Sequence, residues 1–166
     1  MILHLLDMAC SNFSENLKAL SLQKQSEGCY FSKSYTTKMM VICVSRNAKV
    51  GVDIEEKRSR SPETIKYFWE KFKTFEMLNV PTGDDVHSFY TAWTAMESCF
   101  KLNGTSFFTS QNTVVDFSSK SVLHNDIEHA WFEHFDIGNM IICLSSDKKF
   151  TKQDVTIKHY GKEDNK

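Results

Sequence analysis

Two short segments with nearly the same sequence are the strongest constraint on how this chain folds. Residues 40–45 read MVICVS and residues 140–145 read MIICLS, an offset of 100 positions (140 − 40). Apolar, β-branched runs of this length predict buried strands. Each run is followed by a polar turn that ends in lysine, RNAK at 46–49 and SDKK at 146–149. The repeat therefore predicts two related halves packed side by side, with a chance match as the alternative.

The segment after the first of these strands carries two acids on a single face. Residues 50–56 read VGVDIEE, and successive side chains of a strand point to opposite faces. Val52 and Ile54 therefore share an apolar face, whereas Asp53 and Glu55 share the other. Because only the turn RNAK separates this segment from the strand at 39–45, the sequence predicts a hairpin with one acid-bearing face.

Two helices are predicted between this hairpin and a group of later strands. Ser61, Pro62 and Glu63 form a typical helix start, because serine caps, proline fits the first helical position and glutamate suits the helix dipole. A second helix is predicted from about residue 84 to Leu102, ahead of Gly104, and strands are predicted at 113–117, 130–135 and 139–145. This order predicts a mixed α/β (α+β) fold in one domain, residues 1–166, with halves at about 1–58 and 59–160 and a frayed tail at 161–166.

A third acid lies on the apolar side of the second helix. At about 100° per residue, Phe89, Trp93 and Phe100 define one apolar stripe, and Glu97 falls within it. Lys101, four residues later, flanks the same stripe. One interpretation is an ordinary ion pair between Glu97 and Lys101 on a half-exposed helix face. The other interpretation is that Glu97 points into a crevice of the fold.

Three inward-facing carboxylates favour the second interpretation. Asp53, Glu55 and Glu97 would repel one another unless a cation joined them, because an uncompensated buried carboxylate is costly. An all-oxygen set of ligands suits Mg²⁺, or Mn²⁺, rather than zinc. Mg²⁺ commonly completes its coordination shell with substrate phosphate, whose oxygens Lys101 would then meet. The sequence thus predicts a metal and a phosphorylated ligand against this strand.

Composition argues against several other classes of protein. Lys and Arg total 20 and Asp and Glu total 21, so the net charge is near zero and argues against a nucleic-acid binder. The five cysteines form no CxxC pair, which favours a reducing compartment. The longest apolar run, Met39 to Val44, is too short to span a bilayer, and the N-terminus lacks the basic region of a signal peptide. These features predict a cytoplasmic protein that does not insert into a membrane.

The acids and the helix lysine fall within two motifs that resemble the signature of the 4′-phosphopantetheinyl transferase superfamily. The family pattern is G-[VI]-D, a gap of some forty residues, and then [FW]-x-x-K-E-[AS]-x-x-K. This chain has GVDIE at 51–55 and WTAMESCFK at 93–101, with Asp53 and Glu97 44 positions apart (97 − 53). FSKS at 31–34 lies where the larger, surfactin-type members carry F-N-x-S-H-S. The resemblance covers about residues 30–146.

This resemblance implies a Mg²⁺-dependent enzyme with the chemistry of a holo-acyl-carrier-protein synthase. Such enzymes transfer 4′-phosphopantetheine from coenzyme A to a serine of an apo acyl or peptidyl carrier protein and release 3′,5′-ADP. They serve fatty-acid, polyketide or nonribosomal peptide synthesis. Surfactin-type chains have two related halves about a pseudo-twofold axis, and a monomer is the expected state for this chain.

The resemblance also implies roles for individual residues by position. The metal, with the diphosphate of coenzyme A, would be held by Asp53, Glu55 and Glu97. Glu97 would also be the base on the carrier serine, and Lys101 would neutralise charge on the transferring phosphate or the leaving group. The residues implied to contact coenzyme A are Lys33, Ser34 and Lys101.

Three departures from the family pattern leave an alternative function open. Met96 stands where the family carries a lysine, so a cation is lost, and restoring it is expected to raise activity. Lys33 replaces the histidine of S-H-S, although lysine also binds phosphate as a point charge. SEGCY at 26–30 replaces the family's G-K-P stretch, in a segment shorter than that of typical members. The alternative is a catalytically impaired member that binds coenzyme A or a carrier protein without transfer.

Overall fold

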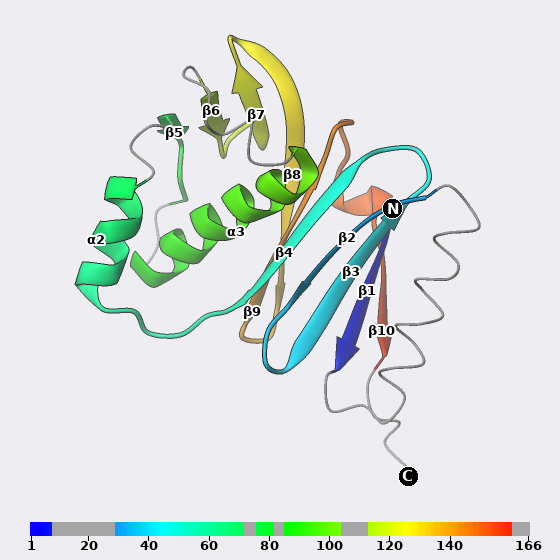
Figure 1. Cartoon of the computed structure of the whole chain (residues 1–166), viewed down its shortest axis with the longest axis horizontal. Helices are drawn as coiled ribbons and strands as arrows, with labels where there is room; N and C mark the ends of the chain where they lie inside the picture. Colours follow the sequence, from blue (N-terminus) through cyan, green and yellow to red (C-terminus); the bar gives the residue numbers. More distant parts are fainter. Residues whose placement is uncertain (8–28, 72–75, 82–84, 104–112, 161–166) are drawn as a thin grey trace.

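A computed structural model of the chain describes residues 1–7, 29–71, 76–81, 85–103 and 113–160. These residues form two β-sheets and two α-helices (Figure 1), which confirms the predicted mixed α+β fold. In chain order the elements are β1 (Ile2–Asp7), β2 (Tyr30–Tyr35), β3 (Met39–Ser45), β4 (Val50–Glu56), α2 (Pro62–Lys71), β5 (Glu76–Leu78), α3 (Asp85–Asn103), β6 (Thr113–Asp116), β7 (Ser121–His124), β8 (Ile127–Ile137), β9 (Met140–Ser146), the 3-10 helix η2 (Lys152–Asp154) and β10 (Thr156–Tyr160).

The smaller sheet has four strands in the order β10-β1-β3-β2. β2 and β3 form an antiparallel hairpin, and β3 pairs along its other edge with β1. The outermost strand, β10, runs parallel to β1, with Thr156 opposite Ile2. Both hydrogen-bonding edges of β3 are therefore occupied, and β2 is an edge strand of this sheet.

The larger sheet has six strands in the order β4-β9-β8-β7-β6-β5. Its edge strand β4 pairs antiparallel with β9, so that Asp53 lies opposite Cys143. The predicted hairpin between residues 39–45 and 50–55 is therefore wrong: both strands form, but they belong to different sheets. The physical reason is that β1 and β2 already satisfy both edges of β3, so β4 pairs with a strand much later in the chain.

The larger sheet lies between the helices and the smaller sheet. From β4, Val52 and Ile54 pack in one apolar cluster with Leu3 and Val41 of the smaller sheet. On the opposite face α3 packs against β4 and β9 and buries Met96. Figure 1 shows α2 and α3 on one side of the molecule and the smaller sheet on the other. The acid-bearing face of β4 is thus turned toward α3, as the alternation of its side chains predicts.

Gly51 allows α3 to lie directly against β4. A β-carbon at this position would come within 1.9 Å of the Ser98 carbonyl oxygen and 2.7 Å of the Leu102 backbone nitrogen. Only glycine permits two backbones to approach this closely. The close approach brings the last turns of α3 over the acids of β4.

Both helices begin where the sequence predicts. α2 begins at Pro62, and the Ser61 side chain caps it by accepting a hydrogen bond from the Thr64 backbone N–H at 3.3 Å. α3 begins at Asp85 and ends at Asn103, one residue beyond the predicted end. Of the helices in the described ranges, none combines the length and apolar character that crossing a membrane requires.

The two repeated segments form β3 and β9, and each lies one strand in from the edge of its sheet. Their cysteines, Cys43 and Cys143, are fully buried, which confirms both segments as buried strands. Each predicted half contributes a strand to the sheet of the other, because β4 joins the larger sheet and β10 joins the smaller one. The pseudo-twofold relation and the division at residue 58 stay predictions, and the tail at 161–166 lies outside the described residues.

Candidate functional site

Three polar side chains from three elements meet at one point beside β4. The Lys101 ammonium, in the last turn of α3, donates hydrogen bonds to Asp53 Oδ1 at 2.6 Å and to Ser34 Oγ at 2.9 Å. The Ser34 hydroxyl donates to the same Asp53 oxygen at 2.8 Å. Asp53 is only 4% exposed, and a carboxylate at this depth needs such partners because its desolvation is costly. Of the predicted site residues, these three are in direct contact.

β2 reaches this point because it lies beside β4. The Ser32 hydroxyl accepts a hydrogen bond from the Val52 backbone N–H at 3.0 Å, which ties the two sheets together. Ser34 follows two residues later on the same face of β2, so it meets Asp53, the residue after Val52. Sequence reasoning missed the part played by Ser32. The available signal was the S-x-S spacing, which places both hydroxyls on the buried face of the strand.

The second carboxylate oxygen of Asp53 is buried and has no hydrogen-bond partner among the residues that the structure describes. Native structures rarely leave such an oxygen unsatisfied, because its desolvation is not repaid. An unsatisfied carboxylate oxygen of this kind fits a hard divalent cation. The oxygen donors here agree with the predicted Mg²⁺ or Mn²⁺ better than with a metal that prefers sulfur or nitrogen.

Glu55 lies on the same face of β4 and is influenced by both other acids. Burial and the charge of Asp53 raise the pKa of Glu55 above its ordinary value, and the charge of Glu97 adds to the increase. Arg60 and a hydrogen bond from the Trp93 side chain act in the opposite direction. A carboxyl group that gains proton affinity from neighbouring acids marks a region of excess negative charge. The sequence analysis did not predict that Arg60 and Trp93 lie at this site. Trp93 could have been predicted, because it lies one helical turn before Glu97 on α3.

Glu97 is half-buried on α3, one turn before Lys101. Lys101 forms its ion pair with Asp53. The interpretation of Lys101 as an ordinary surface partner of Glu97 therefore does not fit the structure. Within the described ranges, no three His, Cys, Asp or Glu side chains form a ready metal-binding group. Asp53 and Glu97 both act electrostatically on Glu55, and the joint binding of a metal by the three acids stays a prediction.

Lys33 and Ser34 point to opposite faces of β2. Ser34 is buried toward Asp53, whereas Lys33 is exposed and lies opposite Ile42 of β3. Neighbouring side chains of a strand diverge in this way. The structure therefore groups Ser34 with Lys101 but not with Lys33, and the contact of Lys33 with coenzyme A stays a prediction.

Met96 packs in the core beneath α3 and is 1% exposed. Its side chain is therefore not at the surface that Glu97 and Lys101 share. A lysine at this position would have to bury its ammonium or extend past the packed side chains around it. The burial of Met96 argues against the expectation that restoring the family lysine raises activity.

Comparison with known proteins agrees with the motifs. The family model ACPS, described as the 4′-phosphopantetheinyl transferase superfamily, matches residues 49–157. The match begins just before β4, ends within β10, and includes Asp53, Glu55, Glu97 and Lys101. Among curated proteins, none matches the chain.

Proposed function

Because the chain belongs to the 4′-phosphopantetheinyl transferase superfamily, we propose that it transfers 4′-phosphopantetheine from coenzyme A to a serine of an apo acyl or peptidyl carrier protein. The serine oxygen bonds to the phosphorus that carries pantetheine, and the bond from that phosphorus to 3′,5′-ADP breaks. The hydroxyl proton passes to a base of the enzyme. The observation that carries the assignment of the site is the meeting of Asp53, Ser34 and Lys101 inside the region that the family model matches.

Lys101 is the proposed cation for the transferring phosphate. Its ammonium is bound to Asp53 and Ser34, yet about a third of the side chain is exposed, so phosphate oxygens can reach it from solvent. Phosphoryl-type transfer depends chiefly on positioning and on neutralising charge. Lys101 supplies that charge, and Ser34 holds the ammonium in place.

Glu97 is the proposed base for the serine of the carrier protein. It is half-buried and one helical turn from Lys101, so a hydroxyl directed at phosphate on Lys101 would pass close to its carboxylate. A base within hydrogen-bond reach of the attacking hydroxyl typically contributes about 10²–10⁴-fold to the rate.

Asp53, Glu55 and Glu97 are the proposed ligands of Mg²⁺. When bound, the ion would neutralise charge on the diphosphate of coenzyme A. The unpartnered Oδ2 of Asp53 supports this assignment, and so does Glu55, whose pKa is raised by burial and by the charge of Asp53. Lys101, which donates to Asp53 and Ser34 beside this set, would meet the phosphate oxygens.

The test is the intact mass of several apo carrier proteins after incubation with this protein, coenzyme A and Mg²⁺, with EDTA in a parallel sample. We expect a gain of one phosphopantetheine that EDTA blocks. Asp53→Asn keeps the size of the side chain but removes its charge and should abolish the gain. Glu128→Gln changes an exposed acid of β8 and should leave it unchanged.

The same experiment separates the proposed enzyme from the alternative of a non-catalytic binder. If no carrier gains mass while calorimetry still detects binding of coenzyme A, the chain is a binding member of the family that does not carry out transfer. If neither transfer nor binding is seen with folded protein, both functions are wrong. Equal transfer by Asp53→Asn and the unaltered chain would show that the site lies elsewhere.

A further inference from the structure

Strand β8 extends past the end of its neighbour β7. Along one edge β8 pairs with β9 from Trp131 to Ile137, whereas along the other edge its ladder with β7 ends at Trp131. One further bond, from the Phe132 backbone N–H to the Lys120 carbonyl oxygen at 2.9 Å, follows on the β7 side. Within the described part of the chain, residues 133–137 therefore have a neighbouring strand along one edge alone.

The backbone groups of His134 and Asp136 point toward this open edge. In an antiparallel ladder, successive residues direct their N–H and C=O groups alternately to one edge and to the other. Since the Phe132 N–H bonds to Lys120 on the β7 side, the residues two and four positions later point the same way. Their backbone N–H and C=O groups bond to none of the residues that the structure describes. The open edge thus presents two donors and two acceptors.

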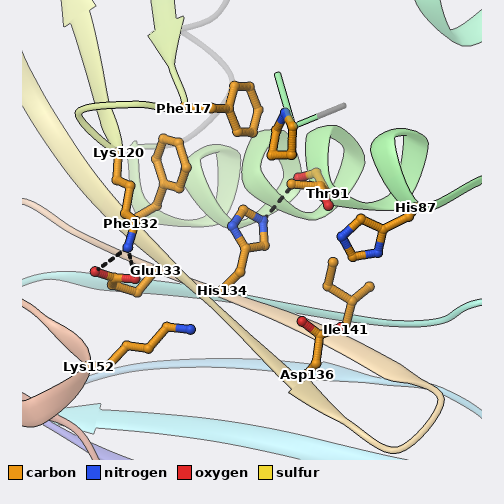
Figure 2. A pocket seen from close by; sticks show the side chains of 11 residues that line it. His87, Thr91, Phe117, Lys120, Phe132, Glu133, His134, Asp136, Ile141 and Lys152 are labelled. Carbon is orange, nitrogen blue, oxygen red and sulfur yellow. Dashed lines mark hydrogen bonds and ion pairs between the residues drawn. The ribbon is translucent and has the colours of Figure 1, made fainter. Parts of the chain in front are cut away.

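A pocket of about 190 Å³ lies at this edge, and both His134 and Asp136 line it (Figure 2). Its walls come from both faces of the sheet. Thr91 belongs to α3, which covers the face from which His134 projects, whereas Lys152 of η2 lies over the Phe135 ring on the opposite face. A space that reaches from one face of a sheet to the other lies beside the strand, where an added strand would lie.

The open edge of β8 calls for a backbone as its partner. Buried backbone N–H and C=O groups are almost always paired, and an open strand edge is a template for another extended chain. Two residues of an extended chain, two positions apart, repeat the spacing of His134 and Asp136. Such a chain satisfies both donors and both acceptors at once, which is the basis of peptide binding by strand addition.

Lys152 adds a preference for one side chain of that partner. It is exposed and makes no ion pair with any described residue. Lys120, which also lines the pocket, donates to Glu133 at 2.8 Å and is already paired. In an antiparallel addition, the partner residue opposite Phe135 projects to the face on which Lys152 lies. An acidic side chain at that position complements the Lys152 ammonium.

We propose that the open edge of β8 binds an extended segment of a partner protein as an additional antiparallel strand. Two alternate residues of the segment exchange backbone hydrogen bonds with His134 and Asp136. Their side chains are small and apolar, because they project to the face where Phe117 and Ile141 line the pocket. The residue between them is acidic and meets Lys152 on the other face. This site does not depend on the proposed transferase activity.

The probe is the peptide acetyl-TVEVT-amide, titrated against the full chain and followed by NMR through the backbone amide signals of His134 and Asp136. We expect saturable shifts of both signals with a dissociation constant of about 1 mM or tighter. Methylation of both valine nitrogens removes the N–H groups that face β8 and should weaken binding by about tenfold or more. Methylation of the glutamate and the last threonine nitrogens, which face away from β8, should leave binding unchanged.

Two variants test the acidic position. Lys152→Met should weaken binding of this peptide about threefold, as expected for an exposed ion pair, and should not alter binding of acetyl-TVQVT-amide. Lys149→Met removes a nearby exposed lysine of the same charge and should have no effect on either peptide.

Three results would overturn the proposal. The first is equal binding of the two methylated peptides, and the second is the absence of saturable shifts at His134 and Asp136. The third is a dimeric mass together with amides of these two residues that are protected from hydrogen exchange before peptide is added, since a second copy would then occupy the edge. Unchanged binding of acetyl-TVEVT-amide by Lys152→Met would overturn the assignment of the acidic residue.

Discussion

Replacing Gly51 with alanine is expected to drive α3 away from β4 and to separate Lys101 from Asp53. The added β-carbon would lie 1.9 Å from the Ser98 carbonyl oxygen, whereas ordinary contact begins at 3.4 Å. The strand and the helix must therefore move apart by about 1.5 Å (3.4 − 1.9). The Ser98 carbonyl oxygen and the Leu102 nitrogen, which lies at 2.7 Å, are backbone atoms, so no side-chain rotation can relieve these two contacts.

The size of the effect follows from this displacement. Overpacking a well-packed core costs about 1–3 kcal/mol when side chains can adjust, so a clash between backbones should cost at least about 3 kcal/mol. A movement of this size also lengthens the 2.6 Å bond between Lys101 and Asp53 beyond hydrogen-bond range. Since a misplacement of about 1 Å costs about 10²-fold in rate at a catalytic site, carrier transfer should fall by about that factor.

Urea unfolding followed by circular dichroism measures the first effect, and the mass assay with a carrier protein measures the second. Gly138→Ala is the matched control: Gly138 has φ +57° and no atom within 4 Å of the added carbon. Its replacement should cost about 1–2 kcal/mol from backbone strain alone and leave transfer unchanged. If Gly51→Ala unfolds within about 0.5 kcal/mol of the unaltered chain, the close packing of α3 on β4 is wrong.

Three further predictions concern charges in the fold. In the absence of Mg²⁺, Lys101→Met should lower the free energy of unfolding by about 2 kcal/mol, because it leaves the buried Asp53 carboxylate without its cation. Solvent reaches part of the site, which keeps the loss from being larger. A loss below about 0.5 kcal/mol in urea unfolding would contradict this. Met96→Lys should destabilise the protein by about 3 kcal/mol or more through a buried ammonium, and a gain in carrier transfer with unchanged stability would show that the side chain reaches the site instead. His134 has a folded pKa of about 4 against 6.5 unfolded, so protons favour the unfolded state in that interval. Stability should fall by up to about 3 kcal/mol as the pH drops from 6.5 to about 4, and His134→Gln should show a flatter dependence in unfolding measured across this range.

Local patterns in the sequence were sufficient to predict the elements that carry the acids. The alternation at 50–56 assigns Val52 to an apolar face and Asp53 to the opposite one, and the structure buries Val52 between the sheets and turns Asp53 toward α3. Ser61 and Pro62 mark the start of α2 because capping and the fixed φ of proline act within a single turn. Predictions of this kind succeed because their causes lie within a few residues.

Strand pairing could not be predicted in the same way. β4 pairs with β9 because β1 and β2 occupy β3, and β1 and β10 were not predicted as strands at all. The residues of β10 are nearly all exposed, so they lack the apolar alternation that identifies a strand. Which strands pair, when they lie far apart in the chain, depends on how all the available strand edges compete for partners. A local sequence pattern does not contain this information.

The helix stripe was also only partly predictable. Trp93 and Phe100 were expected to mark the core side of α3, yet both are only partly buried. The small side chains of Ala92 and Ala95 are fully buried instead. The close approach at Gly51 leaves room for small residues between helix and sheet, although Phe89 of the predicted stripe is buried as expected. Side-chain size therefore mattered as much as apolar character.

The exchange of strands between the two parts of the chain has a consequence for its synthesis. Ile2 pairs with Thr156, 154 positions later (156 − 2). β4 cannot pair until β9, its partner strand much later in the chain, has been made. As the chain leaves the ribosome, β3 and β4 emerge as apolar strands long before the residues that complete either sheet. Unpaired strands at this stage are exposed to association with other chains, and such distant contacts form slowly. A chaperone that holds the nascent chain until residue 160 has emerged should therefore raise the yield of folded protein more than one that acts after release.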